Sequence, residues 1–208
     1  MNKFIVLALT ALAWAPPLGA KPLPSSAPPG APSAATAEYS LPEGRFSVKP
    51  PAGWSASRDP REDERQKAYG VLLSGPRSAD GVLSTMSITF YAPDNSLFKG
   101  GAEEFLKRNL GGGALIVPPA GETAGPVEKS TVGGLPAQRF TRHSHEYIPP
   151  DRTDSKEVAV VEEIEVASAK PGFYVIEFKS SEQLAKTLGH VYARVRASVR
   201  FAAAKDVP

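Results

Sequence analysis

From residue 45 onward, apolar and polar residues alternate in short runs, the pattern of strands that are buried on one face. Three of the predicted strands have the apolar positions Phe46 and Val48, then Tyr69, Val71 and Leu73, then Met86, Ile88 and Phe90. Turn residues at 75–76 and 80–81 separate the last two strands, so an antiparallel hairpin is expected there. Trp54 follows a Pro-Ala-Gly turn at the start of another strand, and we expect it to be buried.

The second half of the chain carries four more strand patterns, at residues 127–132, 136–147, 158–167 and 173–179. A Gly-Gly turn at 133–134 joins the first pair, and an Ala-Lys-Pro-Gly turn at 169–172 joins the second. Apolar side chains occupy both faces of 173–179, so we expect helices or loops to cover both sides of this strand. The mixed-charge run 58–67 has no large apolar residue and is predicted to be a solvated loop.

Two segments have helical periodicity. The first, residues 101–110, has acidic residues in its first turn, basic residues in its last, and a buried stripe of Ala102, Phe105, Leu106 and Leu110. The second is predicted to start at Ser180, which has capping-box spacing to Gln183. Its apolar stripe consists of Leu184, Leu188, Val191, Val195 and Val199. The pattern therefore predicts an α+β fold, with a central antiparallel sheet of about six or seven strands flanked by helices.

Residues 1–20 have the features of a cleavable signal peptide. Lys3 provides the positive start, residues 4–14 are apolar, and Pro16 and Pro17 precede the small pair Gly19 and Ala20. The alternative is a membrane anchor, but a spanning helix needs about 20 apolar residues and this run is much shorter. No cysteine is present to carry a lipid. We therefore expect a periplasmic or secreted protein with no transmembrane segment after signal cleavage.

Residues 21–44 consist mainly of Pro, Ala and Ser, with few large apolar side chains to bury. Such a segment is expected to be a disordered spacer, although it could equally be a tail without a role. Residues 45–203 are then a single domain, and 204–208 are a short tail. The absence of cysteine excludes disulfides, thiolate metal sites and cysteine nucleophiles. The net charge of +2 gives no general attraction to nucleic acid, which we do not expect as a partner.

Three motifs resemble those of the PsbP-like family. They are FSVKPPAGW at 46–54, VGGLPAQR at 132–139, and GFYVI at 172–176 followed by VRASVRF at 195–201. That family includes the photosystem II protein PsbP, a Ran-binding nuclear import factor and DcrB-type bacterial envelope proteins. The resemblance implies an α/β/α sandwich that serves as an accessory or binding module. Its members share no catalytic apparatus, so it implies no active-site residues.

The chain carries none of the common catalytic motifs. It has no G-x-S-x-G elbow, no phosphate-binding Gly-Lys-Ser/Thr loop, no H-E-x-x-H and no dinucleotide fingerprint. With only three histidines, a hydrolase is the least favoured function. We expect a non-catalytic module without a cofactor, acting through protein contacts in the periplasm or cell envelope.

The alternative function is binding of a divalent metal or small ligand. In a strand, His143 and His145 point to the same face, and the turn after them could bring Asp151 or Asp154 close. Two imidazoles and a carboxylate are a common ligand set for Zn²⁺. The competing interpretation, which we favour, is a polar stretch at the exposed end of a hairpin.

Glu162 interrupts the apolar face of its predicted strand, in phase with Val160 and Ile164. A buried carboxylate without a partner is unfavourable, so we expect a bulge or a position at the sheet margin that lets Glu162 reach water. A functional carboxylate is the alternative.

Basic residues follow the polar side of the closing helix. Lys186, His190 and Arg194 recur every four residues, and Arg196 and Arg200 add charge near the helix end. The helix dipole stabilises cations at a C-terminus, which accounts for Arg194, Arg196 and Arg200 but not for Lys186. The functional interpretation is a surface that meets an acidic partner surface or an anionic envelope polymer.

Overall fold

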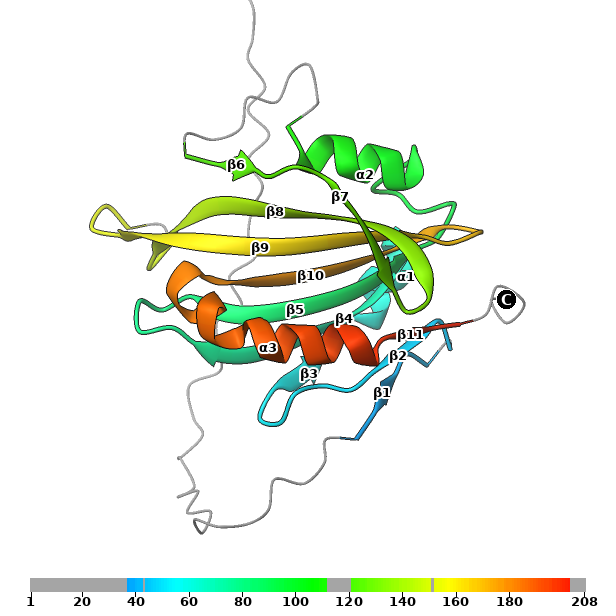
Figure 1. Ribbon diagram of the computed structural model, residues 1–208, viewed down its shortest axis with the longest axis horizontal. Helices are drawn as coiled ribbons and strands as arrows, with labels where there is room; N and C mark the ends of the chain where they lie inside the picture. Colours follow the sequence, from blue (N-terminus) through cyan, green and yellow to red (C-terminus); the bar gives the residue numbers. More distant parts are fainter. Residues whose placement is uncertain (1–36, 43, 112–120, 151, 203–208) are drawn as a thin grey trace, which may run out of the picture. The chain divides into compact units, whose positions relative to one another are not determined.

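A computed structural model describes residues 37–42, 44–111, 121–150 and 152–202 (Figure 1). The expected signal peptide, most of the expected spacer, Asp151 and the tail at 204–208 lie outside these residues. The elements are β1 (Tyr39–Ser40), β2 (Phe46–Val48), β3 (Ser55–Ser57), α1 (Pro60–Gln66), β4 (Ala68–Arg77), β5 (Leu83–Tyr91), α2 (Gly101–Asn109), β6 (Thr123–Ala124), β7 (Glu128–Val132), β8 (Leu135–Ile148), β9 (Lys156–Ser168), β10 (Phe173–Ser181), α3 (Glu182–Ser198) and β11 (Arg200–Phe201).

One large antiparallel sheet organises the domain. Its strand order is β3-β4-β5-β10-β9-β8-β6, and β7 pairs with β8 beside β6, which makes eight strands within the described residues. A second sheet combines β1, β2 and β11, from the two ends of the domain. The predicted fold class is confirmed. The large sheet has more strands than the expected six or seven, and its short edge strand β6 was not predicted.

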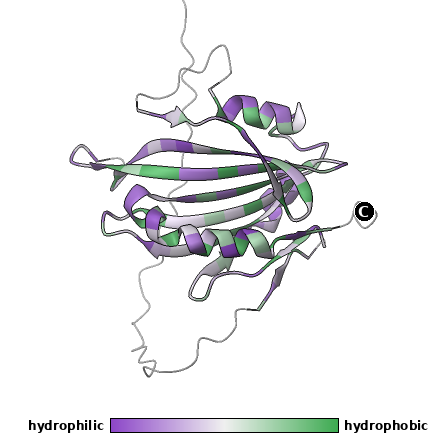
Figure 2. Ribbon diagram, in the orientation of Figure 1, coloured by the Kyte–Doolittle hydropathy of each residue, from purple (hydrophilic) through white to green (hydrophobic). Residues whose placement is uncertain are grey.

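Helix α3 covers one face of the large sheet (Figure 1). Its buried residues Leu188, Tyr192 and Val195 join the core formed by alternate residues of the central strands. The strand residues of this core include Tyr69, Val71, Leu73, Met86, Ile88, Phe90, Tyr174, Ile176 and Phe178. Hydrophobic and hydrophilic residues accordingly alternate along α3 in Figure 2. Among the described residues, no helix is both long and apolar enough to cross a membrane.

Helix α2 packs on the opposite face, where it covers a smaller core. Phe105 and Leu106 contact a cluster of apolar side chains from β8, β9 and β10. The strand residues of this cluster are Phe140, Ile164, Val166, Phe173 and Val175. Strand β10 is therefore buried on both faces, as its apolar residues predicted.

The run 58–67 was predicted to be a loop, and this prediction is wrong. It contains the helix α1, which begins at Pro60 and buries none of its residues. The Asp59 side chain caps the helix by accepting hydrogen bonds from the backbone N–H groups of Arg61 and Glu62. This helix is stabilised by its cap and by local ion pairs. Because none of its residues is buried, it lacks the apolar periodicity from which we predicted the other helices.

The folded domain begins earlier than the expected boundary at residue 45. Tyr39 and Ser40 form β1 against β2, and Leu41 is only 1% exposed in the main core. One further detail differs from expectation, because helix α3 is capped by Ser181 instead of Ser180, since β10 continues through Ser181. Trp54 is partly buried and packs against the main core.

Candidate functional site

Helix α3 is anchored to the sheet by Arg196. The Arg196 guanidinium binds both carboxylate oxygens of Glu165, which is fully buried in β9. Arg196 Nη2 also donates to the Thr131 carbonyl and to the Ser130 hydroxyl of β7, each at 2.8 Å. The hydrogen bond to Glu165 raises the pKa of Arg196. Arg196 is one of the five basic residues predicted to face a partner, and in the structure its guanidinium is instead bound within the protein.

Three of the other predicted partner residues form an exposed stripe on α3. Lys186, His190 and Arg194 are all exposed. They recur every four residues on one helix face, over about 12 Å at 1.5 Å per residue. Their side chains have neither an ion-pair nor a hydrogen-bond partner among the described residues. The exposure predicted from the sequence is therefore found, and the three side chains are available for contact.

The end of this stripe borders a small hollow between α3 and the β1/β2 pair. The hollow has a volume of about 400 Å³, and Lys49, Arg194 and Arg200 bring three cations to its lining. Glu38 is the acid in this lining, and it accepts a hydrogen bond from the Ser47 hydroxyl. Arg200 donates to the carbonyls of Ala197 and Val199 near the helix end. Sequence reasoning missed Lys49 because no local pattern links it to a helix that lies so far away in the chain.

The predicted metal ligands are not brought together in the described part of the chain. His143 Nδ1 lies 2.9 Å from Glu182 Oε1, and His145 Nδ1 lies 3.6 Å from Glu157 Oε1, so each imidazole has its own glutamate. The Asp154 carboxylate is bound by the Arg152 guanidinium at 2.8–2.9 Å. No cluster of three metal-ligating side chains occurs in the described ranges, and Asp151 lies outside them.

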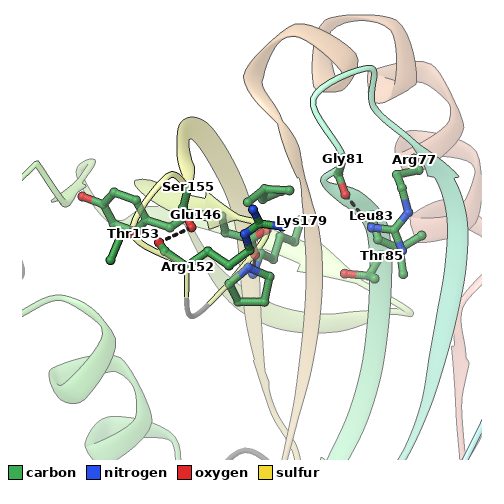
Figure 3. Close-up of a pocket in the computed structure, with 12 residues that line it drawn as sticks. Arg77, Gly81, Leu83, Thr85, Glu146, Arg152, Thr153, Ser155 and Lys179 are labelled. Atoms are coloured by element: carbon green, nitrogen blue, oxygen red, sulfur yellow. Dashed lines mark hydrogen bonds and ion pairs between the residues drawn. The ribbon is translucent and has the colours of Figure 1, made fainter. Parts of the chain in front are cut away.

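A larger hollow lies on the α2 side of the sheet, between the tips of the β4–β5 and β8–β9 hairpins. Its volume is about 1100 Å³. Figure 3 shows Arg77 and Gly81 on one side of it and Arg152 and Ser155 on the other. The lining residues are Arg77, Gly81, Leu83, Thr85, Glu146, Tyr147, Ile148, Pro150, Arg152, Thr153, Ser155 and Lys179. Sequence reasoning missed this site because it is assembled from two turns more than sixty residues apart.

Beside this hollow, charged residues form a cross-strand network. Lys179 pairs with Glu146 and lies 4.0 Å from a carboxylate oxygen of Glu162. Glu162 in turn accepts a hydrogen bond from Arg142, its register partner on β8. The expectation that Glu162 reaches water is wrong. It is 4% exposed within a regular strand pair, because Arg142 compensates its charge.

Glu177 lies on the next strand beside this network. Burial raises the pKa of its carboxyl above the ordinary value, and the nearby Glu162 raises it further. The cations Arg142 and Lys179 act in the opposite direction. Glu177 thus keeps its proton to a higher pH than a solvated glutamate does.

No protein-family model matches this chain, and the search of curated proteins found no match. Similar solved structures include a protein of Bacteroides thetaiotaomicron (14% identity, TM-score 0.48, 80% of this chain and 48% of that one), so this chain spans about half of its length. They also include cyanobacterial PsbP of Synechocystis, with 14% sequence identity and a TM-score of 0.48, a match that covers 86% of this chain and 99% of that one. A third is LpqN of Mycobacterium tuberculosis, described as involved in cell envelope biogenesis. Its sequence identity is 12% and its TM-score is 0.46, and the match covers 80% of this chain and 90% of that one. Matches with identities of 12–14% and TM-scores of 0.46–0.48 say nothing of the family, activity or partners of this chain.

Proposed function

We propose that this protein is an exported, non-catalytic accessory module that binds an acidic protein surface in the periplasm or cell envelope through the outer face of α3. The observation that carries the proposal is the stripe of Lys186, His190 and Arg194, which is exposed and has no acidic partner among the described residues. Charges left unpaired on one face favour a partner of complementary charge. The signal-peptide pattern of residues 1–20 supports the export part of the proposal.

The hollow at the end of the stripe is the expected centre of contact. Lys49, Arg194 and Arg200 reach it from different elements, so an aspartate or glutamate entering it would meet cations on several sides. Hydrogen bonds to charged groups contribute about 1.5–3 kcal/mol each when well formed. The rest of the stripe lies toward the solvent, where salt screens the attraction between charges. We therefore expect Arg194 to contribute more to binding than Lys186.

The residues between the cations favour a protein partner over a membrane. Ala193 and Ala197 are exposed and small, which lets another folded surface approach the helix backbone. A helix that binds a membrane surface needs a large apolar face for the lipid. The apolar face of α3 is already packed on the sheet through Leu188, Tyr192 and Val195.

Site-specific photo-crosslinking in living cells tests the proposal. A photo-reactive residue placed at Ala193 should yield a protein adduct, to be identified by mass spectrometry. Lys186→Glu combined with Arg194→Glu should abolish the adduct. The matched control is Arg61→Glu combined with Lys107→Glu, two exposed cations on α1 and α2 whose reversal changes the net charge by the same amount.

The proposal requires that the control variant keeps the adduct and that the crosslinked peptide of the partner is acidic. Both variants should melt within a few degrees of the unmodified protein. An adduct that survives reversal of Lys186 and Arg194 would exclude this face as the contact. An adduct with a polysaccharide or lipid in place of a protein would overturn the protein partner in favour of an anionic polymer or a membrane.

A further inference from the structure

We infer that the hollow between the two hairpins binds a small anionic amphiphile, a molecule with one acidic group on an apolar body. The site is independent of the proposed contact of α3, since it lies on the opposite, α2 side of the sheet. Its volume of about 1100 Å³ is that of a site for a small molecule.

The hollow forms because β10 is shorter at this end of the sheet than the hairpins on either side of it. Strand β10 lies between β5 and β9 and stops at Ser181, where the chain turns into α3. The hairpins on either side continue past this point. An ion pair between Lys156 and Asp80 joins their tips. The two walls therefore belong to different hairpins and are held together in the unliganded protein.

Apolar contacts reinforce the junction of the hairpins. Val82 is 1% exposed and packs with Val158 and Val160 of the other hairpin, beside Ile148. At Gly81 a side-chain carbon would lie 2.9 Å from Ile148, so the hairpins approach each other closely there. The hollow thus has preformed walls, which lowers the ordering entropy that a ligand must overcome.

The charges of the lining favour an anion. Arg77 of β4, Lys179 of β10 and Arg152 of the β8–β9 turn supply three cations, and Glu146 is the one acid of the lining. Glu146 is already paired with Lys179, and Arg152 is paired with Asp154. Arg77 donates to the Gly81 carbonyl and has no acidic partner within the described chain. The free charge of Arg77 is the recognition point for the acidic group, and it repels a cationic ligand.

The remaining lining favours an apolar body. Leu83 and Ile148 come from the two facing hairpins, and Pro150 follows in the turn. Tyr147 is also among the lining residues, and as a residue it is 58% exposed. Covering apolar surface releases about 25 cal/mol for each Å² removed from water. A fatty acid or a similar organic acid combines the two properties, whereas inorganic phosphate would leave the apolar side uncovered.

Calorimetry with three probes of equal chain length tests this inference on the purified chain that begins at residue 21. The probes are dodecanoate, dodecanol and dodecyltrimethylammonium, each below its aggregation concentration. We expect dodecanoate to bind at least tenfold more tightly than the other two, because a charge-assisted hydrogen bond contributes about 1.5–3 kcal/mol. Higher salt should weaken the binding of dodecanoate alone.

Two variants locate the binding. Arg77→Gln should reduce dodecanoate affinity about tenfold and leave the dodecanol affinity unchanged, while Arg61→Gln, an exposed arginine of α1, should change neither. Thr85→Trp places a large side chain in the hollow and should abolish binding of every probe. Melting curves verify that each variant is folded, and Thr85→Trp tests the site even if Arg77→Gln loosens its hairpin.

Equal affinity for the neutral, cationic and anionic probes would overturn the preference for an acid. Undetectable binding of dodecanoate would overturn the site itself. Dodecanoate binding that is unchanged in both Arg77→Gln and Thr85→Trp would place the binding elsewhere on the protein and equally overturn the inference.

Discussion

Arg196 of α3 holds both carboxylate oxygens of Glu165, an acid that lies fully buried in β9. The Ser130 hydroxyl donates a further hydrogen bond of 2.7 Å to Glu165 Oε1. The contact joins α3, β9 and β7 across the face that carries the main core. It also explains how a strand of the sheet interior tolerates an acid, because the charge is compensated by a cation from the covering helix.

Arg196→Met should destabilise the protein by about 3 kcal/mol, since it leaves Glu165 buried without its counter-charge. The double variant Arg196→Met with Glu165→Met should recover a large part of this loss, because no buried charge then remains. Urea unfolding of the two single variants and the double variant measures the coupling. Additive losses would contradict the assignment of this pair as one unit.

Glu177→Gln should stabilise the protein at neutral pH. The pKa of Glu177 is raised in the folded state, so its contribution to stability is fully present below the ordinary pKa of 4.5 and is lost as the pH rises through the folded-state pKa. Glutamine resembles the protonated carboxyl at every pH. The gain in melting temperature should thus be largest near pH 7 and should vanish as the pH falls below the ordinary pKa. An equal gain in melting temperature near pH 7 and below the ordinary pKa would show that the stabilisation does not come from the titration of Glu177.

Gly75→Ala should lower stability by about 1–3 kcal/mol. A side-chain carbon at this position would lie 2.3 Å from the indole ring of Trp54, so the ring must move. Trp54 emission should shift toward longer wavelengths as the ring becomes more exposed. Gly189→Ala is the control, because it has open space within α3 and should instead stabilise the protein by about 0.5–1 kcal/mol.

Shortening the N-terminal region should leave the melting temperature unchanged until the truncation removes β1. A chain that begins at residue 37 should melt like one that begins at residue 21, because the composition of 21–36 offers little to bury. A chain that begins at residue 43 lacks β1 and the buried Leu41, whose loss alone should cost about 2–5 kcal/mol. Equal melting of all three chains would show that β1 contributes nothing to stability.

Elements with a complete hydrophobic period could be predicted closely from the sequence. Residues 101–110 were predicted as a helix and form α2 at Gly101–Asn109, and residues 136–147 were predicted as a strand and form β8 at Leu135–Ile148. Helix α1 could not be found in this way, since it buries no residue. Its signals were the Asp59 cap, the proline at the first helical position and the acidic first turn.

The candidate sites were less accessible to sequence reasoning. The exposed basic residues of α3 follow from local spacing and were predicted. The partner of Glu162 was not, because Arg142 meets it only through the register of two strands twenty residues apart. The hollow between the hairpins depends in addition on where β10 ends, and a shift of one residue moves every side chain to the other face. Local patterns therefore identify elements, whereas sites formed across strands need the register.

Strand β10 passes into α3 without a connecting loop, since Ser181 both ends the strand and caps the helix. This continuity has a mechanical consequence. A partner pulling on α3 along its axis would load β10 directly, with no slack segment to lengthen first. Because β10 is hydrogen-bonded to β5 on one side and β9 on the other, the load is shared by two ladders in shear. A force applied to the outer face of α3 would therefore be transmitted directly to the middle of the sheet.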